Sequence, residues 1–180
     1  GLGDVYKRQQ GDLPVFAWGR YDGQLKQAIA KLKYDRQPEI GSLLGKWLGH
    51  SWLNRNLIKQ QKITVIPIPL HHQKLKIRGY NQAAIIAKSF CQQTGYLLNN
   101  KSLIRVRNTK AMYELNPSER IKNLKNAFAI SDRLPKYPVL LLDDIYTSGT
   151  TVKEDTKVLQ QHNIKVMGIV VIAKTSKIVK

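Results

Sequence analysis

The sequence predicts an α/β protein with a doubly wound, mostly parallel sheet. Segments typical of strands alternate with segments typical of helices, an order that favours parallel strands joined by helical crossovers. Two strand segments, VLLL at 139–142 and MGIVVIA at 167–173, are continuously apolar rather than alternating. Strands of that kind are buried on both faces of a sheet, as doubly wound folds require.

The N-terminal third divides into an unassigned stretch and a helical segment. Residues 1–20 carry no interpretable pattern, and their start at Gly1 fits either a fragment end or foreign sequence. Residues 21–60 are expected to form two helices, the first capped by Asp22 and the second beginning at Pro38. Glycines recur every fourth residue in the second helix, which predicts a smooth face for close helix packing: Gly41, Gly45 and Gly49.

The sheet itself is expected within residues 61–180. The β-branched run at 62–69 predicts a buried strand, and a basic loop, HHQKLKIRGYN at 71–81, is expected after it. Asn116, with Glu119 three residues later, predicts a helix start with a capping box. The remaining expected elements are a helix around 84–90, a strand at 102–107, a helix at 116–126, a strand at 139–143, a helix at 150–162 and a strand at 165–173.

Charge is the unusual feature of the composition. Thirty Lys and Arg residues stand against twelve Asp and Glu, which gives a net charge of +18 and a sequence pI near 10.1. A pI above about 9 suggests a polyanionic partner such as nucleic acid. The excess is spread along the whole chain, so a generally basic proteome is an equal alternative.

The sequence also bears on location. Its longest uncharged apolar run, residues 167–173, is far shorter than the ~20 residues of a membrane-spanning helix. No N-terminal segment has the pattern of a secretory signal. The lone Cys91 can form neither an internal disulfide nor a metal site by itself. We therefore expect no membrane insertion and a cytoplasmic protein.

The stretch PVLLLDDIYTSGTT, residues 138–151, carries the strongest chemical signal. Asp143 and Asp144 stand at the expected carboxyl end of a parallel strand, where such sheets bind ligands. A hydroxyl-rich turn behind them supplies backbone N–H groups at a helix start, which suits a phosphate: Thr147, Ser148, Gly149, Thr150 and Thr151. Because carboxylates repel phosphate, the two acids are expected to accept hydrogen bonds from the 2′- and 3′-hydroxyls of a ribose 5-phosphate. The alternative is a solvated strand end with an Asp capping the next turn.

This stretch resembles the phosphoribosyl-diphosphate (PRPP) binding motif of type I phosphoribosyltransferases. A second resemblance covers the chain from Tyr21 to its end. It is carried by LKY at 32–34, IPIPL at 66–70, RGYNQA at 78–83, RxRxT at 105–109, Leu115, Arg120, Asn123, Ala127–Phe128 and LLLDDIYTSGTT. In this order and spacing the chain is similar to the ComF family, competence-associated proteins with a phosphoribosyltransferase-like domain. The resemblance implies a type I phosphoribosyltransferase-like fold for residues 61–180.

Two features depart from the family pattern. Many members carry a four-cysteine zinc element at the N-terminus, and this sequence has no such cysteines. The family often has Gln three residues after the Thr of RxRxT, where this chain has Met112.

The resemblance also implies roles for the residues after the first core strand. Leu70 and His71 would approach pyrophosphate, and Arg78 would reach the same anion. Mg²⁺ would enter with PRPP and not through direct protein ligands. Residues 74–81, with Gly79 as the hinge, are expected to form a mobile lid. The alternatives are a solvated loop around His71 and a plain turn at Arg78–Gly79.

The leading functional hypothesis is a ComF-like protein of DNA uptake that binds PRPP or a nucleotide and contacts single-stranded DNA, with competence proteins as further partners. An active phosphoribosyltransferase of nucleotide salvage and a PRPP-sensing regulator are the alternatives. No segment identifies a pocket for an acceptor substrate, so the sequence assigns no catalytic residue and leaves open whether the protein is an enzyme.

Overall fold

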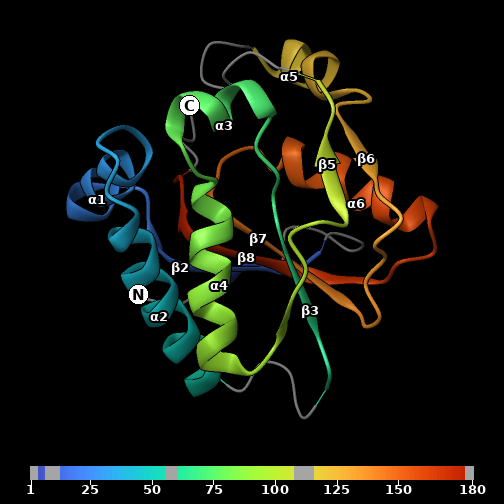
Figure 1. Cartoon of the computed structure of the whole chain (residues 1–180). Helices are drawn as coiled ribbons and strands as arrows, with labels where there is room; N and C mark the ends of the chain where they lie inside the picture. The colour runs from blue at the N-terminus through green and yellow to red at the C-terminus, as the bar shows by residue number, and fades with distance from the viewer. Residues whose placement is uncertain (1–3, 7–12, 56–60, 108–115, 177–180) are drawn as a thin grey trace.

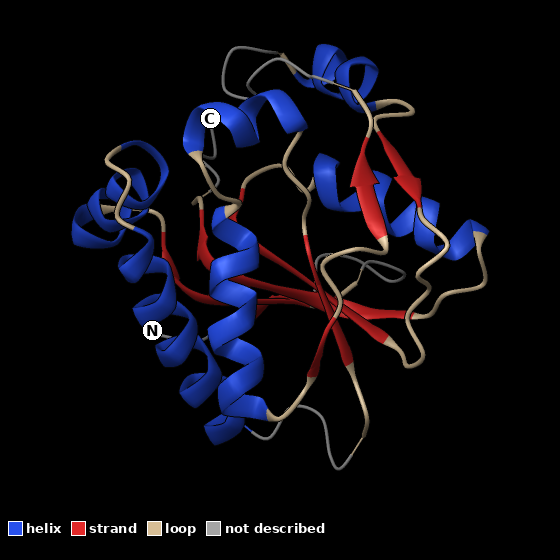
Figure 2. Cartoon of the chain, viewed as in Figure 1, coloured by secondary structure: helices blue, strands red, loops and turns tan. Residues whose placement is uncertain are grey.

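The computed structural model describes residues 4–6, 13–55, 61–107 and 116–176. Its centre is a six-stranded sheet in the order β1-β2-β8-β7-β3-β4, in which the β1–β2 pair is antiparallel and the other pairs are parallel (Figures 1 and 2). The strands are β1 (Asp4–Tyr6), β2 (Val15–Arg20), β3 (Thr64–Pro67), β4 (Leu97–Leu98), β7 (Val139–Tyr146) and β8 (Val166–Lys174). The doubly wound, mostly parallel sheet is therefore confirmed.

Helices cover both faces of this sheet, each over its own hydrophobic core (Figure 1). One face carries α1 (Gly23–Tyr34), α2 (Pro38–Arg55) and α4 (Gln82–Thr94). The other carries α5 (Pro117–Leu124), α6 (Thr150–Gln161) and a small antiparallel pair, β5 (Leu103–Arg105) with β6 (Phe128–Ile130). A short helix, α3 (His72–Arg78), follows β3. None of the helices in the described ranges combines the length and the apolar character that crossing a bilayer requires.

The glycine face of α2 packs against α4, as the spacing predicts. A Cβ at Gly45 would lie 2.3 Å from the backbone oxygen of Ile86, closer than real contacts allow. Gly49 meets the Cβ of Gln93 in the same way, at 2.6 Å. Side chains at these positions would push the two helices apart, so only glycine permits this approach.

Two helix starts follow the sequence signals, and a third lacks the capping contact expected of it. The second helix of the N-terminal segment begins at Pro38. Asn116 and Glu119 form the expected capping box, in which each side chain accepts a hydrogen bond from the other's backbone N–H at 2.9 Å. Asp22 stands at the N-cap of α1, yet its side chain makes no capping hydrogen bond and pairs with Arg20 at 3.3 Å instead.

Three expectations need correction. Residues 15–20 carry no element assignment from the sequence, yet they form β2 and pair in parallel with β8 inside the main sheet. The strand expected at 139–143 runs on to Tyr146, because it continues to pair with the long β8. The basic loop expected at 71–81 is mostly helical: α3 spans seven residues without burying any side chain, so no apolar stripe could reveal it.

Candidate functional site

The candidate site lies at the carboxyl edge of the parallel sheet, where β3 and β7 end side by side. Pro67 of β3 is in register with Leu142 of β7, so the residues that follow each strand meet at this edge. Leu70 and His71 come from the β3 side, and the acid pair and the hydroxyl-rich turn come from the β7 side. Ligands of doubly wound folds bind in the crevice outside such strand ends.

The turn after β7 forms an open cradle at the start of α6. Gly149 is the N-cap of α6 and adopts the left-handed conformation, with φ 75° and ψ 6°. It has no side chain to cap the helix, but the Ser148 Oγ accepts from the Thr150 backbone N–H at 3.4 Å. The Ser148 and Thr150 hydroxyls hydrogen-bond each other at 2.8 Å. The turn is tied to the sheet through the Tyr146 carbonyl, which accepts from the Thr175 backbone N–H at 3.1 Å. Thr147 is exposed, and Thr151 is half-buried in the first turn of α6. The backbone N–H groups in the first turn of a helix have no carbonyl partner within the helix, so such a turn attracts anions.

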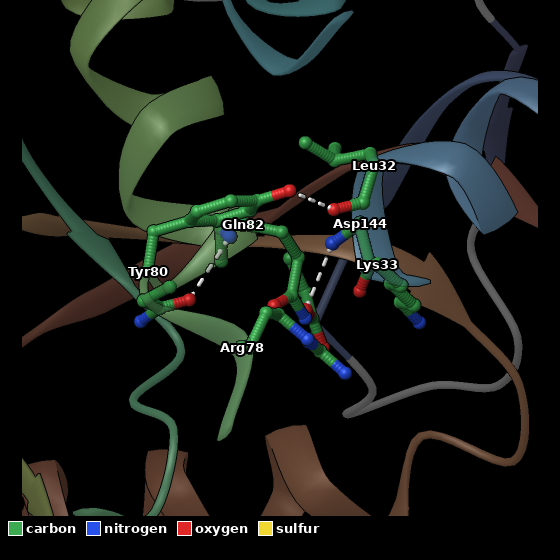
Figure 3. A network of polar contacts seen from close by, with 9 residues as sticks. Leu32, Lys33, Arg78, Tyr80, Gln82 and Asp144 are labelled. Carbon is green, nitrogen blue, oxygen red and sulfur yellow. Dashed lines mark hydrogen bonds and ion pairs between the residues drawn. The ribbon is translucent and has the colours of Figure 1, made fainter. Parts of the chain in front are cut away.

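The acid pair behind the cradle is held by a lysine from α1. The Lys33 Nζ lies 2.6 Å from the Asp144 Oδ2, and the two side chains are only 19% and 4% exposed (Figure 3). Burial opposes the charge on both groups. The attraction between them outweighs it, so the pKa of Asp144 is lowered and the pKa of Lys33 is raised. Asp144 is thus an ionised, compensated carboxylate in the buried interior.

The RGYNQ segment ties α1 to this edge of the sheet. The Arg78 guanidinium donates to the Gln82 Oε1 and lies over the Tyr34 ring, 5.8 Å from its centroid. The Tyr80 hydroxyl donates to the Leu32 carbonyl (Figure 3). Asn81 caps α4 through the Ala83 N–H at 3.0 Å and donates to the Ile68 carbonyl. The sequence motifs LKY and RGYNQ are therefore two halves of one contact between α1 and the β3–α4 connection.

Asp143 belongs to a second group of charges on the α6 side. It is half-buried, and its Oδ1 accepts from the Asp144 backbone N–H at 2.8 Å. Burial and the neighbouring Asp144 carboxylate raise the pKa of Asp143 well above its usual range. Asp155 of α6 is fully buried, and neither of its carboxylate oxygens accepts a hydrogen bond within the described part of the chain. Burial, and then the charge of Asp143, raise the pKa of Asp155 well above normal, while Arg105 of β5 opposes that rise.

Asp155→Asn is expected to raise the melting temperature at neutral pH. A carboxyl whose pKa is raised by folding destabilises the folded state above that pKa, and the effect vanishes below its pKa in the unfolded chain. The difference in melting temperature between variant and wild type should therefore be largest at high pH and shrink as the pH falls toward about 4. Thermal melts from pH 4 to 8 measure it, with Asp35→Asn, at the exposed end of α1, as the control. A difference that grows as the pH falls would contradict this account.

The remaining residues expected at the site sit around α3. His71 is buried and caps this helix, its Nδ1 accepting from the Gln73 N–H at 3.3 Å, while His72 is exposed. Leu70 is half-buried next to it. Gly79 ends the helix in the left-handed conformation, φ 89°, and donates its N–H to the Leu75 carbonyl. The pyrophosphate role of these residues and the lid motion of 74–81 stay predictions. Their backbone is a capped helix rather than an open loop.

Four residues of this edge are absent from the site expected from the sequence: Lys33, Gln82, Arg105 and Asp155. The first three stand inside quoted motifs, but nothing in a motif tells which side chains turn toward the acids. Asp155 could have been found from the sequence. It lies on the same buried face of α6 as Val152 and Leu159, and a charged residue on an apolar helix face is unusual. Met112, Leu115 and the end of RxRxT lie outside the described residues.

Comparison with models of known protein families gives no match. The chain is 30% identical to "Competence protein F" of Haemophilus influenzae over 152 residues, which are 82% of this chain and 66% of that protein. The chain belongs to the ComF family. Two further relatives are less similar. Over 86% of this chain, the identity to "DNA utilization protein YhgH" of Salmonella typhimurium is 26%. Over 81% of this chain, the identity to "Competence protein ComFC" of Streptococcus pneumoniae is 27%. The chain spans 69% and 61% of those two proteins, or about two thirds of its curated ComF relatives.

Among solved structures, the fold matches that of an adenine phosphoribosyl transferase from Trypanosoma brucei. The TM-score is 0.51 over 97% of this chain and 87% of that one, at 8% sequence identity. The similarity is one of fold alone, and it bears out the type I phosphoribosyltransferase-like fold expected from the sequence.

Proposed function

We propose that this ComF chain is a PRPP- or nucleotide-binding protein that acts in DNA uptake in the cytoplasm and contacts single-stranded DNA. One observation supports the ligand: the turn at Gly149 and the Asp143–Asp144 pair lie at the same edge of the sheet. The cradle suits the 5-phosphate, and the acid pair suits the neighbouring ribose hydroxyls, since anions favour helix starts and carboxylates accept from hydroxyls.

Mg²⁺ is proposed to arrive on the diphosphate of PRPP. The proposal gives the ion no direct protein ligands. When bound, Mg²⁺ would neutralise part of the diphosphate charge. The Arg78 and His71 side of the edge would then face the diphosphate.

The role in DNA uptake rests on the names of the relatives, which are competence and DNA utilization proteins. The net charge of +18 supports contact with a nucleic acid. The fold of the adenine phosphoribosyl transferase favours one further candidate, a transferase reaction with an unidentified acceptor.

Two titrations test the proposal. PRPP with Mg²⁺ at a hundred times its dissociation constant should stabilise the fold by about 2.7 kcal/mol, a clear thermal shift. Fluorescent single-stranded DNA should bind with little sequence preference, with log K falling by about 0.7 per log unit of salt for each phosphate neutralised. If PRPP with Mg²⁺ causes no thermal shift, the proposed PRPP binding is wrong. If single-stranded DNA does not bind even at low salt, the proposed DNA contact is wrong. Release of pyrophosphate with a panel of bases and amines would favour the transferase.

A further inference from the structure

The two acids of the site have different surroundings, although they are neighbours in the chain. Asp144 is 3% exposed and already paired with Lys33, whereas Asp143 is half-buried and forms no ion pair within the described ranges of the chain. Asp144 offers little exposed surface to a ribose hydroxyl, and its Oδ2 could accept from a ligand only in place of the lysine. That exchange would leave a buried ammonium without a counter-ion, which is strongly unfavourable.

We propose that Lys33 and Asp144 are positioning residues, a buried ion pair that holds α1 against the site and places a positive charge beside Asp143, the acid that contacts the ribose hydroxyls. The inference rests on the proposed PRPP site and assigns different roles to its two aspartates. Asp143 binds the ligand, and the ion pair acts through Asp143.

The charges around Asp143 come from four elements. Asp144 adjoins it on β7. Three further charged groups interact with it electrostatically: Lys33 of α1, Asp155 of α6 and Arg105 of β5. Lys33 favours the ionised form of Asp143 and Asp144 opposes it. Removing Lys33 alone therefore leaves Asp143 beside an uncompensated carboxylate, and Asp143 then ionises only at higher pH.

The contacts of α1 support the coupling. The residues on either side of Lys33 are both held. The Leu32 carbonyl accepts from the Tyr80 hydroxyl (Figure 3). The Tyr34 ring lies under the Arg78 guanidinium. Gln82, which accepts from Arg78, also favours the ionised form of Asp144 by hydrogen bonding. These contacts hold the part of α1 that carries Lys33 in place, and so they hold Lys33 beside Asp144.

The experiment compares PRPP affinity as a function of pH in a set of variants at a temperature well below their melting points. Lys33→Met should weaken PRPP binding tenfold or more near pH 6, and the loss should shrink as the pH rises. Lys33→Arg should restore most of the affinity. The double variant Lys33→Met/Asp144→Asn should also recover to within about threefold of wild type, because it removes the repelling carboxylate together with the lysine. Lys31→Met, an exposed position of α1, is the matched control and should follow wild type.

Thermal melts without ligand give a second, independent measurement. Lys33→Met and Asp144→Asn should each lower the melting temperature, and the double variant should lose less than the sum of the two. The inference is overturned if the double variant binds PRPP as weakly as Asp143→Asn, because Asp144 would then contact the ligand itself. It is also overturned if Lys33→Met has the wild-type pH profile. A wild type that shows no PRPP binding at any pH overturns the proposed function, and the melts still decide whether the ion pair exists.

Discussion

Asp143→Asn, alone or together with Asp144→Asn, is expected to abolish the thermal shift that PRPP and Mg²⁺ produce. An Asn at 143 keeps the shape of the side chain but loses the charge, and a hydrogen bond to a charged group is worth roughly 1.5–3 kcal/mol. Loss of one such bond lowers affinity by about tenfold or more, since 1.4 kcal/mol corresponds to a factor of ten. A PRPP concentration near the wild-type dissociation constant makes this loss visible as a missing shift.

The ligand-free variants separate binding from folding. Asp143→Asn should melt no lower than wild type at neutral pH, because burial already makes the ionised form of Asp143 unfavourable. The double variant should melt lower, because it leaves the Lys33 ammonium without its carboxylate partner. Differential scanning fluorimetry with and without PRPP measures both effects, and Asp35→Asn is again the control. If the double variant shows the wild-type thermal shift with PRPP, neither aspartate belongs to the PRPP site.

The central sheet is predictable because burial on both faces leaves a direct record in the residues. VLLL and MGIVVIA have no polar alternation, and both are strands of the parallel sheet. The glycine spacing of α2 and the capping box of α5 are equally local signals, and each corresponds to a contact of the folded chain. Signals of this kind need only the spacing of neighbours in the sequence.

The missed parts either depend on partners far away in the chain or lack an apolar face. The segment VFAWGR at 15–20 forms a strand because it pairs with β8, which lies about 150 residues later in the chain. No residue near 15–20 indicates that pairing. The helix HQKLKIR has no apolar face, since it buries no side chain, and it depends on a His71 cap and a Gly79 end. Lys33 is one of three lysines within α1, and only the folded position of Asp144 distinguishes it.

Gly149→Ala is expected to cost more stability than any other glycine-to-alanine change in the turns, and to remove PRPP binding. Gly149 has φ 75°, a left-handed conformation that costs an alanine about 1–2 kcal/mol. A Cβ there would also lie 2.3 Å from the Tyr146 hydroxyl oxygen and 2.7 Å from the ring carbon that bears it. Tyr146 is 6% exposed and packed in the core, so its ring cannot swing away freely. Overpacking of this kind adds about 1–3 kcal/mol.

Gly95→Ala supplies the matched control, because Gly95 has nearly the same backbone, φ 74°, and no atom within 4 Å of its Cβ position. It should therefore lose only the backbone contribution to the free energy of unfolding, measured by urea denaturation, and keep the full PRPP shift. Gly149→Ala should lose the backbone and the packing contributions together. Its displaced turn would also carry the N–H groups at the start of α6 away from the phosphate. If the two variants lose equal stability, the contact with Tyr146 is relieved at little cost. If Gly149→Ala keeps the PRPP shift, the turn after β7 is not the phosphate cradle.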